Sequence, residues 1–238
     1  GFKLSADDAM SVSDKFAAIA AASASDYDEI ATALSKVASQ AKLAGMSIDY
    51  TTALLTTGLE VTREAPETMG TALKTIIARM REISDYGETL EDGTDLNNVE
   101  TQLKYIGIAL TDDKGELRST EDVLDELGKK WQDLNSNQQA AIAKALAGTR
   151  QQSRLIAMMD NYERVQELNE ISQRSSGATA AQLSKYMEGF EAAINNIKVA
   201  WEKLVETFVN SNFVTTLING GASILNTLNN IASNPVMK

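Results

Sequence analysis

The sequence of 238 residues contains neither histidine nor cysteine, and it has only two prolines. Without histidine there is no imidazole for general acid–base catalysis, and without cysteine there is no thiol nucleophile. The same two absences remove the commonest zinc ligands and any disulfide. Most catalytic classes are therefore excluded before any motif is considered. Two prolines can interrupt few helices, so a largely helical chain is permitted.

The sequence also lacks a long hydrophobic run. A membrane-spanning helix needs ~18 consecutive apolar residues, and the nearest candidate, 208–228, is interrupted by four asparagines and two glycines. The opening residues carry acids and show no signal peptide. With 43% hydrophobic residues the chain can bury a sizeable core. We expect one integrated domain that belongs to a longer protein.

The net charge of −11 is concentrated in one stretch of the sequence. Residues 82–126 hold 14 acidic and three basic side chains, and the rest of the chain is electrically balanced. An acidic segment repels nucleic acid phosphates and anionic membranes, which argues against sequence-specific nucleic acid binding. A solvated surface is the simplest interpretation, although contact with a basic partner also fits.

The first third of the sequence predicts four short amphipathic helices. The first covers 7–22, and the second opens at 25–29, where an oxygen acceptor precedes early acids. Gly45 supplies a stop, and Ser47 starts the third helix. Pro66 suits the first turn of a fourth helix that continues through Ile83.

The middle of the sequence is more varied. Residues 85–95 read as a loop, and a brief helix follows around 99–106. Apolar residues then alternate from Ile106 to Leu110 before a turn at 111–115, which predicts a small β-hairpin near 106–117. The run 119–122 predicts a capped helix start. From Ser136 onward the pattern is helical, with a break at Gly148.

These patterns predict an all-α fold with at most one small β-hairpin and a long C-terminal amphipathic helix. The composition divides the chain into an N-terminal helical part, 1–84, an acidic insertion, 85–135, and a C-terminal helical part, 136–238. We expect these three parts to form one integrated domain.

The strongest helical period lies in the last third. Its apolar residues recur over about six turns of one helix, so they form a continuous stripe. Large apolar side chains in such a stripe are costly to leave in water, and we predict a packing seam against the N-terminal helices or a second copy. An ordinary intramolecular core is the simpler interpretation. The seam residues are Tyr186, Phe190, Ile197, Trp201, Leu204 and Phe208.

No catalytic, metal-binding or cofactor-binding residue is predicted. Acid pairs occur at 112–113, 121–122 and 125–126, but they lie in a charge-dense region rather than in the apolar cleft that raises a catalytic pKa. The loop at 112–121 fails the EF-hand register, because Gly115 in the sixth position would place Leu110 in the first. No phosphate-binding loop is present, and 148–150 reads as a helix break.

The order of several segments resembles the core of bacteriophage tail tape measure proteins. The resemblance begins with 26–55 and continues through 67–76, which contains the Gly-Thr-Ala-Leu sequence at 70–73. A turn at 113–117, the alanine-rich stretch 134–148 and the terminal pattern 200–208 follow in the expected order. The resemblance covers roughly 5–232, and its specificity lies in the order of the segments.

The resemblance implies a structural protein of long-tailed phages or prophages. Such proteins set tail length as a helical template inside the tail tube, and they leave ahead of the DNA during genome ejection. The implied locations are the tail lumen of the virion and, during assembly, the bacterial cytoplasm. The implied partners are further copies of the chain, tail tube or tail assembly chaperone proteins, and the host envelope. Short helices and loops predict a compact domain rather than one extended rod.

Two other functions stay open on the sequence. One is a helical adaptor or interaction module of cellular origin, for which a sustained heptad pattern would be expected. The other is a peptidoglycan hydrolase that uses carboxylates alone. Zinc peptidases need histidine and papain-like hydrolases need cysteine and histidine, so the hydrolases that some tape measure proteins carry would lie elsewhere in the parent chain.

Overall fold

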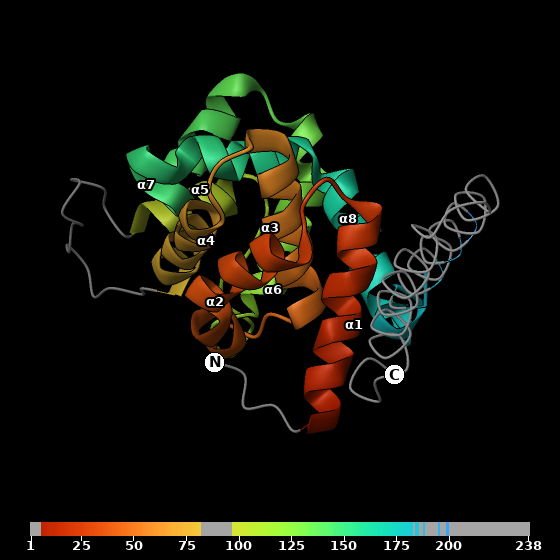
Figure 1. Cartoon of the computed structure of the whole chain (residues 1–238). Helices are drawn as coiled ribbons and strands as arrows, with labels where there is room; N and C mark the ends of the chain where they lie inside the picture. The colour runs from red at the N-terminus through yellow and green to blue at the C-terminus, as the bar shows by residue number, and fades with distance from the viewer. Residues whose placement is uncertain are drawn as a thin grey trace, which may run out of the picture. The chain divides into compact units, whose positions relative to one another are not determined.

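The computed structural model describes residues 6–81 and 97–182, together with the single positions 184, 185, 188, 195 and 199. Every regular element within these residues is a helix, which confirms the all-α prediction (Figure 1). The elements are α1 (Ala6–Ala22), α2 (Tyr27–Leu43), α3 (Ile48–Thr62), α4 (Pro66–Arg81), α5 (Asn97–Tyr105), α6 (Thr120–Lys130), the 3-10 helix η1 (Trp131–Asp133), α7 (Ser136–Asp160) and α8 (Tyr162–Gln173).

Local signals begin and end α2 and α3 as the sequence predicts. The Asp26 carboxylate accepts the Glu29 N–H at 2.8 Å, and the Glu29 carboxylate accepts the Asp26 N–H at 3.0 Å, which forms a capping box. Gly45 follows α2 in the left-handed region, at φ +73°. The Ser47 hydroxyl then accepts the Tyr50 N–H at 3.1 Å and caps α3.

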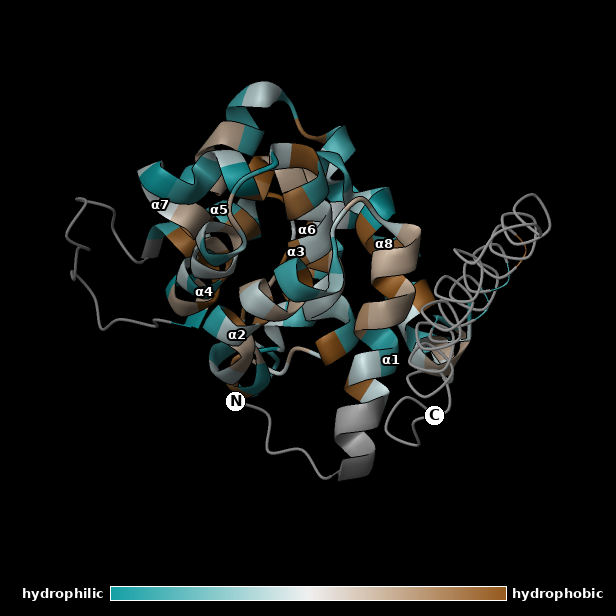
Figure 2. Ribbon diagram, in the orientation of Figure 1, coloured by the Kyte–Doolittle hydropathy of each residue, from teal (hydrophilic) through white to brown (hydrophobic). Residues whose placement is uncertain are grey.

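Helix α3 is the centre of the fold. Ten consecutive residues, Tyr50–Leu59, are buried, so this helix has no solvent face over most of its length. Figure 1 shows α3 between α4 on one side and α1 with α8 on the other, and α3 contacts all three. The buried residues of the surrounding helices are mainly apolar, and Figure 2 shows hydrophobic and hydrophilic residues alternating along these helices.

The most extensive helix contact joins α2 and α4. It is close because Gly70 has no side chain: a Cβ at this position would lie 2.3 Å from the Ala33 carbonyl oxygen. Met69 and Met80 are fully buried in the core. Leu73 is buried between them on α4.

The predicted β-hairpin at 106–117 is reduced to a single antiparallel bridge between Thr111 and Leu117. Burial alternates over 106–110 as expected, with Ile108 and Leu110 inside. The Asp112 carboxylate, however, accepts the N–H groups of Lys114 and Glu116, both at 2.9 Å. These side-chain bonds tighten the turn, and pairing does not extend beyond it into strands.

Helix α6 begins at Thr120, as the sequence predicts, but the expected side-chain cap is absent. Ser119 is the N-cap residue, but its hydroxyl makes no capping bond and instead donates to the Gly45 carbonyl at 2.9 Å. The Thr120 N–H donates to the Ala44 carbonyl at 2.9 Å, and Glu121 accepts the Ser47 N–H at 2.6 Å. The start of α6 is therefore held by hydrogen bonds to the α2–α3 loop, which take the place of a local cap.

Helix α7 begins at an Asn135–Gln138 capping box and is interrupted at Gly148, where φ is 66° and ψ is 175°. This non-helical conformation confirms the predicted break. No helix among the described residues combines the length and apolar character needed to cross a bilayer.

The chain divides into two compact units, Gly1–Thr179 and Ala180–Lys238. All of the labelled helices belong to the first unit. The predicted division at 84 and 135 stays a prediction. The six seam residues lie outside the described residues, so the seam also stays a prediction.

Candidate functional site

Charged and polar side chains join α1, α3 and α8 at both ends of α3. Lys15 of α1 meets Asp49 near the start of α3, and the last residue of α1, Ala22, lies beside Glu60 near its end. Helix α1 therefore runs parallel to α3. Arg164 and Ser172 of α8 contact the same two acids in the opposite order, so α8 is antiparallel to both.

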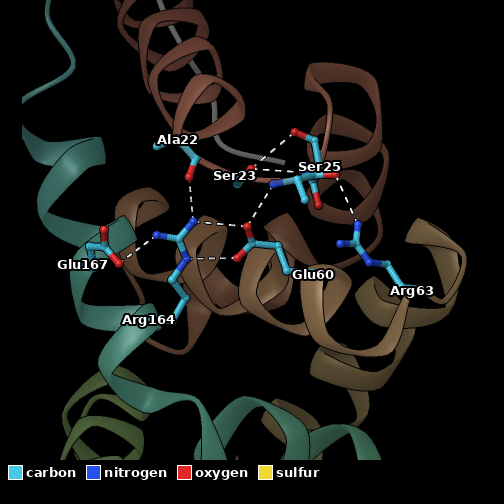
Figure 3. A network of polar contacts seen from close by, with 8 residues as sticks. Ala22, Ser23, Ser25, Glu60, Arg63, Arg164 and Glu167 are labelled. Atoms are coloured by element: carbon cyan, nitrogen blue, oxygen red, sulfur yellow. Dashed lines mark hydrogen bonds and ion pairs between the residues drawn. The ribbon is translucent and has the colours of Figure 1, made fainter.

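The first of these contacts is centred on Arg164 (Figure 3). Its Nε and Nη2 atoms donate to the two carboxylate oxygens of Glu60, each at 3.1 Å. Nη2 also donates to the Ala22 carbonyl at 2.6 Å, and Nη1 donates to Glu167 at 2.7 Å. The Glu60 side chain is only 15% exposed. One guanidinium thus connects three helices that are distant in the sequence.

Glu60 also holds the chain just after α1. It accepts the Ala24 N–H at 2.9 Å, while Arg63 donates to the Ala24 carbonyl at 3.4 Å. Partial burial on its own raises the pKa of Glu60, but hydrogen bonds from Arg164 and Ala24 and the nearby cationic charges lower it below its ordinary value. Hydrogen bonds to Glu60 and Glu167 raise the pKa of Arg164 despite burial. Both groups are held ionised.

The second contact is centred on Asp49. One oxygen of its carboxylate accepts both the Lys15 ammonium and the Ser172 hydroxyl, each at 2.5 Å. Ser172 is fully buried, and the side chains of Lys15 and Asp49 are less than one-fifth exposed. Asp49 therefore fastens α1 and α8 to the start of α3, as Glu60 does at its end.

Asp14 extends this arrangement to the segment that follows α8. Its carboxylate accepts the N–H groups of Gly177 at 2.7 Å and Thr179 at 3.0 Å. These hydrogen bonds lower the pKa of Asp14. The Thr179 hydroxyl also donates to Ser13 at 3.3 Å. The last residues of the first unit are thereby bound to α1, more than 160 positions earlier in the sequence.

A buried chain of hydroxyl groups connects α3, α8 and α6. The Tyr50 and Tyr162 hydroxyls are 3.1 Å apart, and Tyr162 donates to Asp125 at 2.5 Å. Burial raises the pKa of both tyrosines, and the neighbouring Asp125 carboxylate adds to the shift. Both phenols stay protonated, so this chain satisfies buried polar groups rather than supplying a reactive base.

The acidic residues of the middle segment also have structural partners. Glu126 accepts from Arg118 at 2.5 Å, and this hydrogen bond lowers the pKa of Glu126. Asp112 holds its turn, and Glu121 and Asp125 make the contacts given above. In the described part of the chain no group of three or more potential metal ligands is present.

A depression of about 530 Å³ lies beside the start of α8. Lys129 and Arg164 on its wall are already paired, with Asp125 and Glu60 respectively. Asp160 accepts the buried Trp131 indole N–H at 2.6 Å. Because these charged groups are occupied by protein partners, we assign no ligand to the depression.

The sequence prediction did not include the Glu60–Arg164 and Lys15–Asp49 contacts. A signal existed within α3: Asp49 and Glu60 are eleven residues apart, close to three helical turns, and both flank an otherwise buried helix. Two acids on one face of a core helix indicate cationic partners, but the partners lie in distant segments and carry no local pattern.

The comparison with known proteins assigns the chain to a family. A family model described as phage-related minor tail protein matches residues 1–148. This match covers α1 to α6 and α7 up to its break at Gly148. No solved structure matches the chain. Because the match extends over more than half of the sequence, the chain belongs to the phage-related minor tail protein family.

Proposed function

We propose that this chain is a compact domain of a tape measure protein, which templates tail length inside the tail tube and is released during genome ejection. The observation that carries the proposal is the family match over 1–148. The resemblance of the ordered segments over 5–232 to tape measure proteins also supports it. Five of the described helices, α1, α2, α4, α7 and α8, contact α3, and they give this domain the form of a packed bundle.

Tail length tests this proposal directly. The coding sequence of the chain is deleted in frame from its parent gene, and tails are measured by electron microscopy. We expect tails of altered length or a failure of tail assembly. If the chain were extended inside the tail as one continuous helix, its 238 residues would span about 360 Å of tail length at ~1.5 Å per residue. Normal tails of unchanged length would contradict the proposal.

The location inside the tail is tested separately. Purified virions are treated with protease, and peptides of this chain are quantified before and after triggered ejection. Protein in the lumen is protected in intact tails and is lost from emptied particles. Peptides that are digested in intact virions would contradict a luminal position, whereas peptides that stay in emptied particles would contradict release.

We further propose that the domain acts by protein contacts and has no hydrolytic activity of its own. Further copies of the chain, the tail tube and a tail assembly chaperone are the proposed partners, with envelope contact during ejection. The structural roles of Asp112, Asp125 and Glu126 support this. A peptidoglycan release assay is expected to show no turnover. Turnover that is lost with one carboxylate while folding is preserved would contradict it.

A further inference from the structure

The face of α3 that receives α1 and α8 is unusually polar. Asp49 and Glu60 mark this face through their bonds to Lys15, Ser172 and Arg164. At 100° per residue, Glu60 lies about 20° around the helix axis from Asp49, so the two acids define one stripe. The opposite side of α3 carries Gly58, which contacts Met69 of α4.

Three buried hydroxyl groups lie on or beside this stripe. By the same helical geometry Thr56 is about 20° from Asp49, Thr52 about 60° and Thr57 about 80°. All three residues are fully buried, and their Oγ1 atoms have no hydrogen-bond partner among the described residues. A buried polar group without a partner is unfavourable in the folded state and is relieved when the group reaches water.

Thr51 shows that the lack of a hydrogen-bond partner depends on which face of α3 a threonine occupies. It is equally buried on the same helix, but its hydroxyl donates to the Ser47 carbonyl at 2.6 Å. Its position is about 200° from Asp49, on the side away from α1 and α8. The unpartnered hydroxyls therefore gather on the stripe side, between the two charged contacts.

The α2–α4 contact has the opposite character. Apart from Arg79, which donates to the Ala145 carbonyl of α7, the buried residues of α2 and α4 are apolar, and Gly70 brings the two backbones into direct contact. The contacts of α1 and α8 also bury apolar side chains, which opening would expose. They are Phe16, Ile19, Val165 and Leu168.

We propose that α1 and α8 form a separable layer that opens from the polar face of α3 while α2 and α4 stay folded. The two helices contact each other, Asp49 bonds to both of them, and Glu60 bonds to Arg164 of α8, which also donates to the Ala22 carbonyl of α1. Opening also breaks the bonds of Tyr162 to Tyr50 of α3 and to Asp125 of α6. Opening brings the Thr52, Thr56 and Thr57 hydroxyls into water. The layer includes the first helix of the unit and the helix that leads to Thr179. It is a conformational device beyond the tail role, and it does not depend on that role.

Native-state amide hydrogen exchange of the full 238-residue chain tests the proposal. Amides of α1 and α8 are expected to share one opening reaction and to exchange at least about tenfold faster than the protected amides of α2 and α4. The Thr52→Val/Thr56→Val double variant is expected to slow exchange in α1 and α8 by at least about tenfold, because it removes two unpartnered hydroxyls. Equal protection of all four helices in the unmodified chain overturns the proposal.

Two control variants separate the layer from general stability. Thr51→Val removes a satisfied hydroxyl on the other side of α3, so it should not slow exchange in α1 or α8. Ile77→Val in the core-facing part of α4 should speed exchange in α2 and α4 and leave α1 and α8 unchanged. If Ile77→Val changes all four helices alike, or if the double threonine variant slows nothing, the separable layer is wrong.

Thiol labelling gives a second readout, because the chain has no cysteine of its own. A single Thr56→Cys thiol is expected to react at least about tenfold faster than an Ala72→Cys thiol, which is buried on α4. Reaction of the two thiols at equal rates overturns the proposal.

Discussion

Gly58 and Gly70 lie where two helices approach more closely than a side chain permits. A Cβ at Gly70 would lie 2.3 Å from the Ala33 carbonyl oxygen, which belongs to the backbone of α2. A Cβ at Gly58 would lie 2.6 Å from the Met69 sulfur, near the end of a side chain that can change rotamer. The two glycines therefore differ in what must move to admit a methyl group.

Gly70→Ala should lower the free energy of unfolding by about 1–3 kcal/mol, since the added methyl separates two backbones. This loss is expected even though alanine favours a helix by up to ~1 kcal/mol over glycine. Gly58→Ala is the matched control and should lose less, because only Met69 has to move. Urea unfolding followed by circular dichroism measures both. A Gly70→Ala variant as stable as the original chain would contradict the close contact.

Residues that act on near neighbours were predictable, and residues that act across the fold were not. Asp26 and Ser47 bond to N–H groups three residues away, so the sequence alone located both helix starts. Ser119 has the same local pattern, but its hydroxyl bonds to Gly45, 74 positions earlier. Gly70 was noted only as part of a resemblance, because the carbonyl oxygen that excludes a side chain belongs to another helix.

At the scale of whole elements, helices were predicted better than their surroundings. Periodicity located α1 to α4 and the break at Gly148, because each amphipathic helix repeats its apolar residues along one face. The burial of α3 on all sides was not predicted, since its threonines read as polar positions. The extent of strand pairing in the predicted hairpin was overestimated. The alternation of apolar residues at 106–110 reflects burial and does not require a partner strand.

The contacts that join α1, α3 and α8 predict a dependence on acid. Because the pKa of Glu60 is lower in the folded chain than its ordinary value of 4.5, ionised Glu60 stabilises the fold above that pH. This contribution is lost as the pH falls through the lowered folded pKa. Glu60→Gln should therefore lower unfolding free energy at pH 7 by about 1–3 kcal/mol and flatten its decline below pH ~4.5.

Glu167→Gln is the matched control for this prediction. Glu167 pairs with the same Arg164, but its side chain is 59% exposed against 15% for Glu60. An exposed ion pair contributes little, so the control should change unfolding free energy by less than about 0.5 kcal/mol at pH 7. Urea unfolding at several pH values measures both variants. Parallel pH curves for Glu60→Gln and the original chain would show that Glu60 does not carry this dependence.

At the scale of the molecule, the family could be recognised before the packing could be described. The order of several segments along a sequence can identify a family even where each motif alone is weak. The resemblance over 5–232 agrees in this way with the family match over 1–148. The division at Thr179 is a property of the three-dimensional contacts, and the Ser-Ser-Gly run at 175–177, just before it, marks a turn but does not by itself define a boundary between units. The predicted seam lies in the second unit, Ala180–Lys238.

Trp201 provides the test of that seam. If the seam belongs to the core of a monomer, Trp201→Ala should lower the free energy of unfolding by about 3–5 kcal/mol, and this is the expected result. The chain has two tryptophans, so Trp131, which is buried in the first unit, is then the only tryptophan of the chain and reports on that unit by its fluorescence. Thermal unfolding and sedimentation are measured together.

An unchanged melting temperature with lost self-association would place the seam between two copies, because removal of a contact between copies weakens association and leaves the monomer intact. If neither quantity changes, Trp201 is not part of a packing seam, and the interpretation of the C-terminal stripe fails.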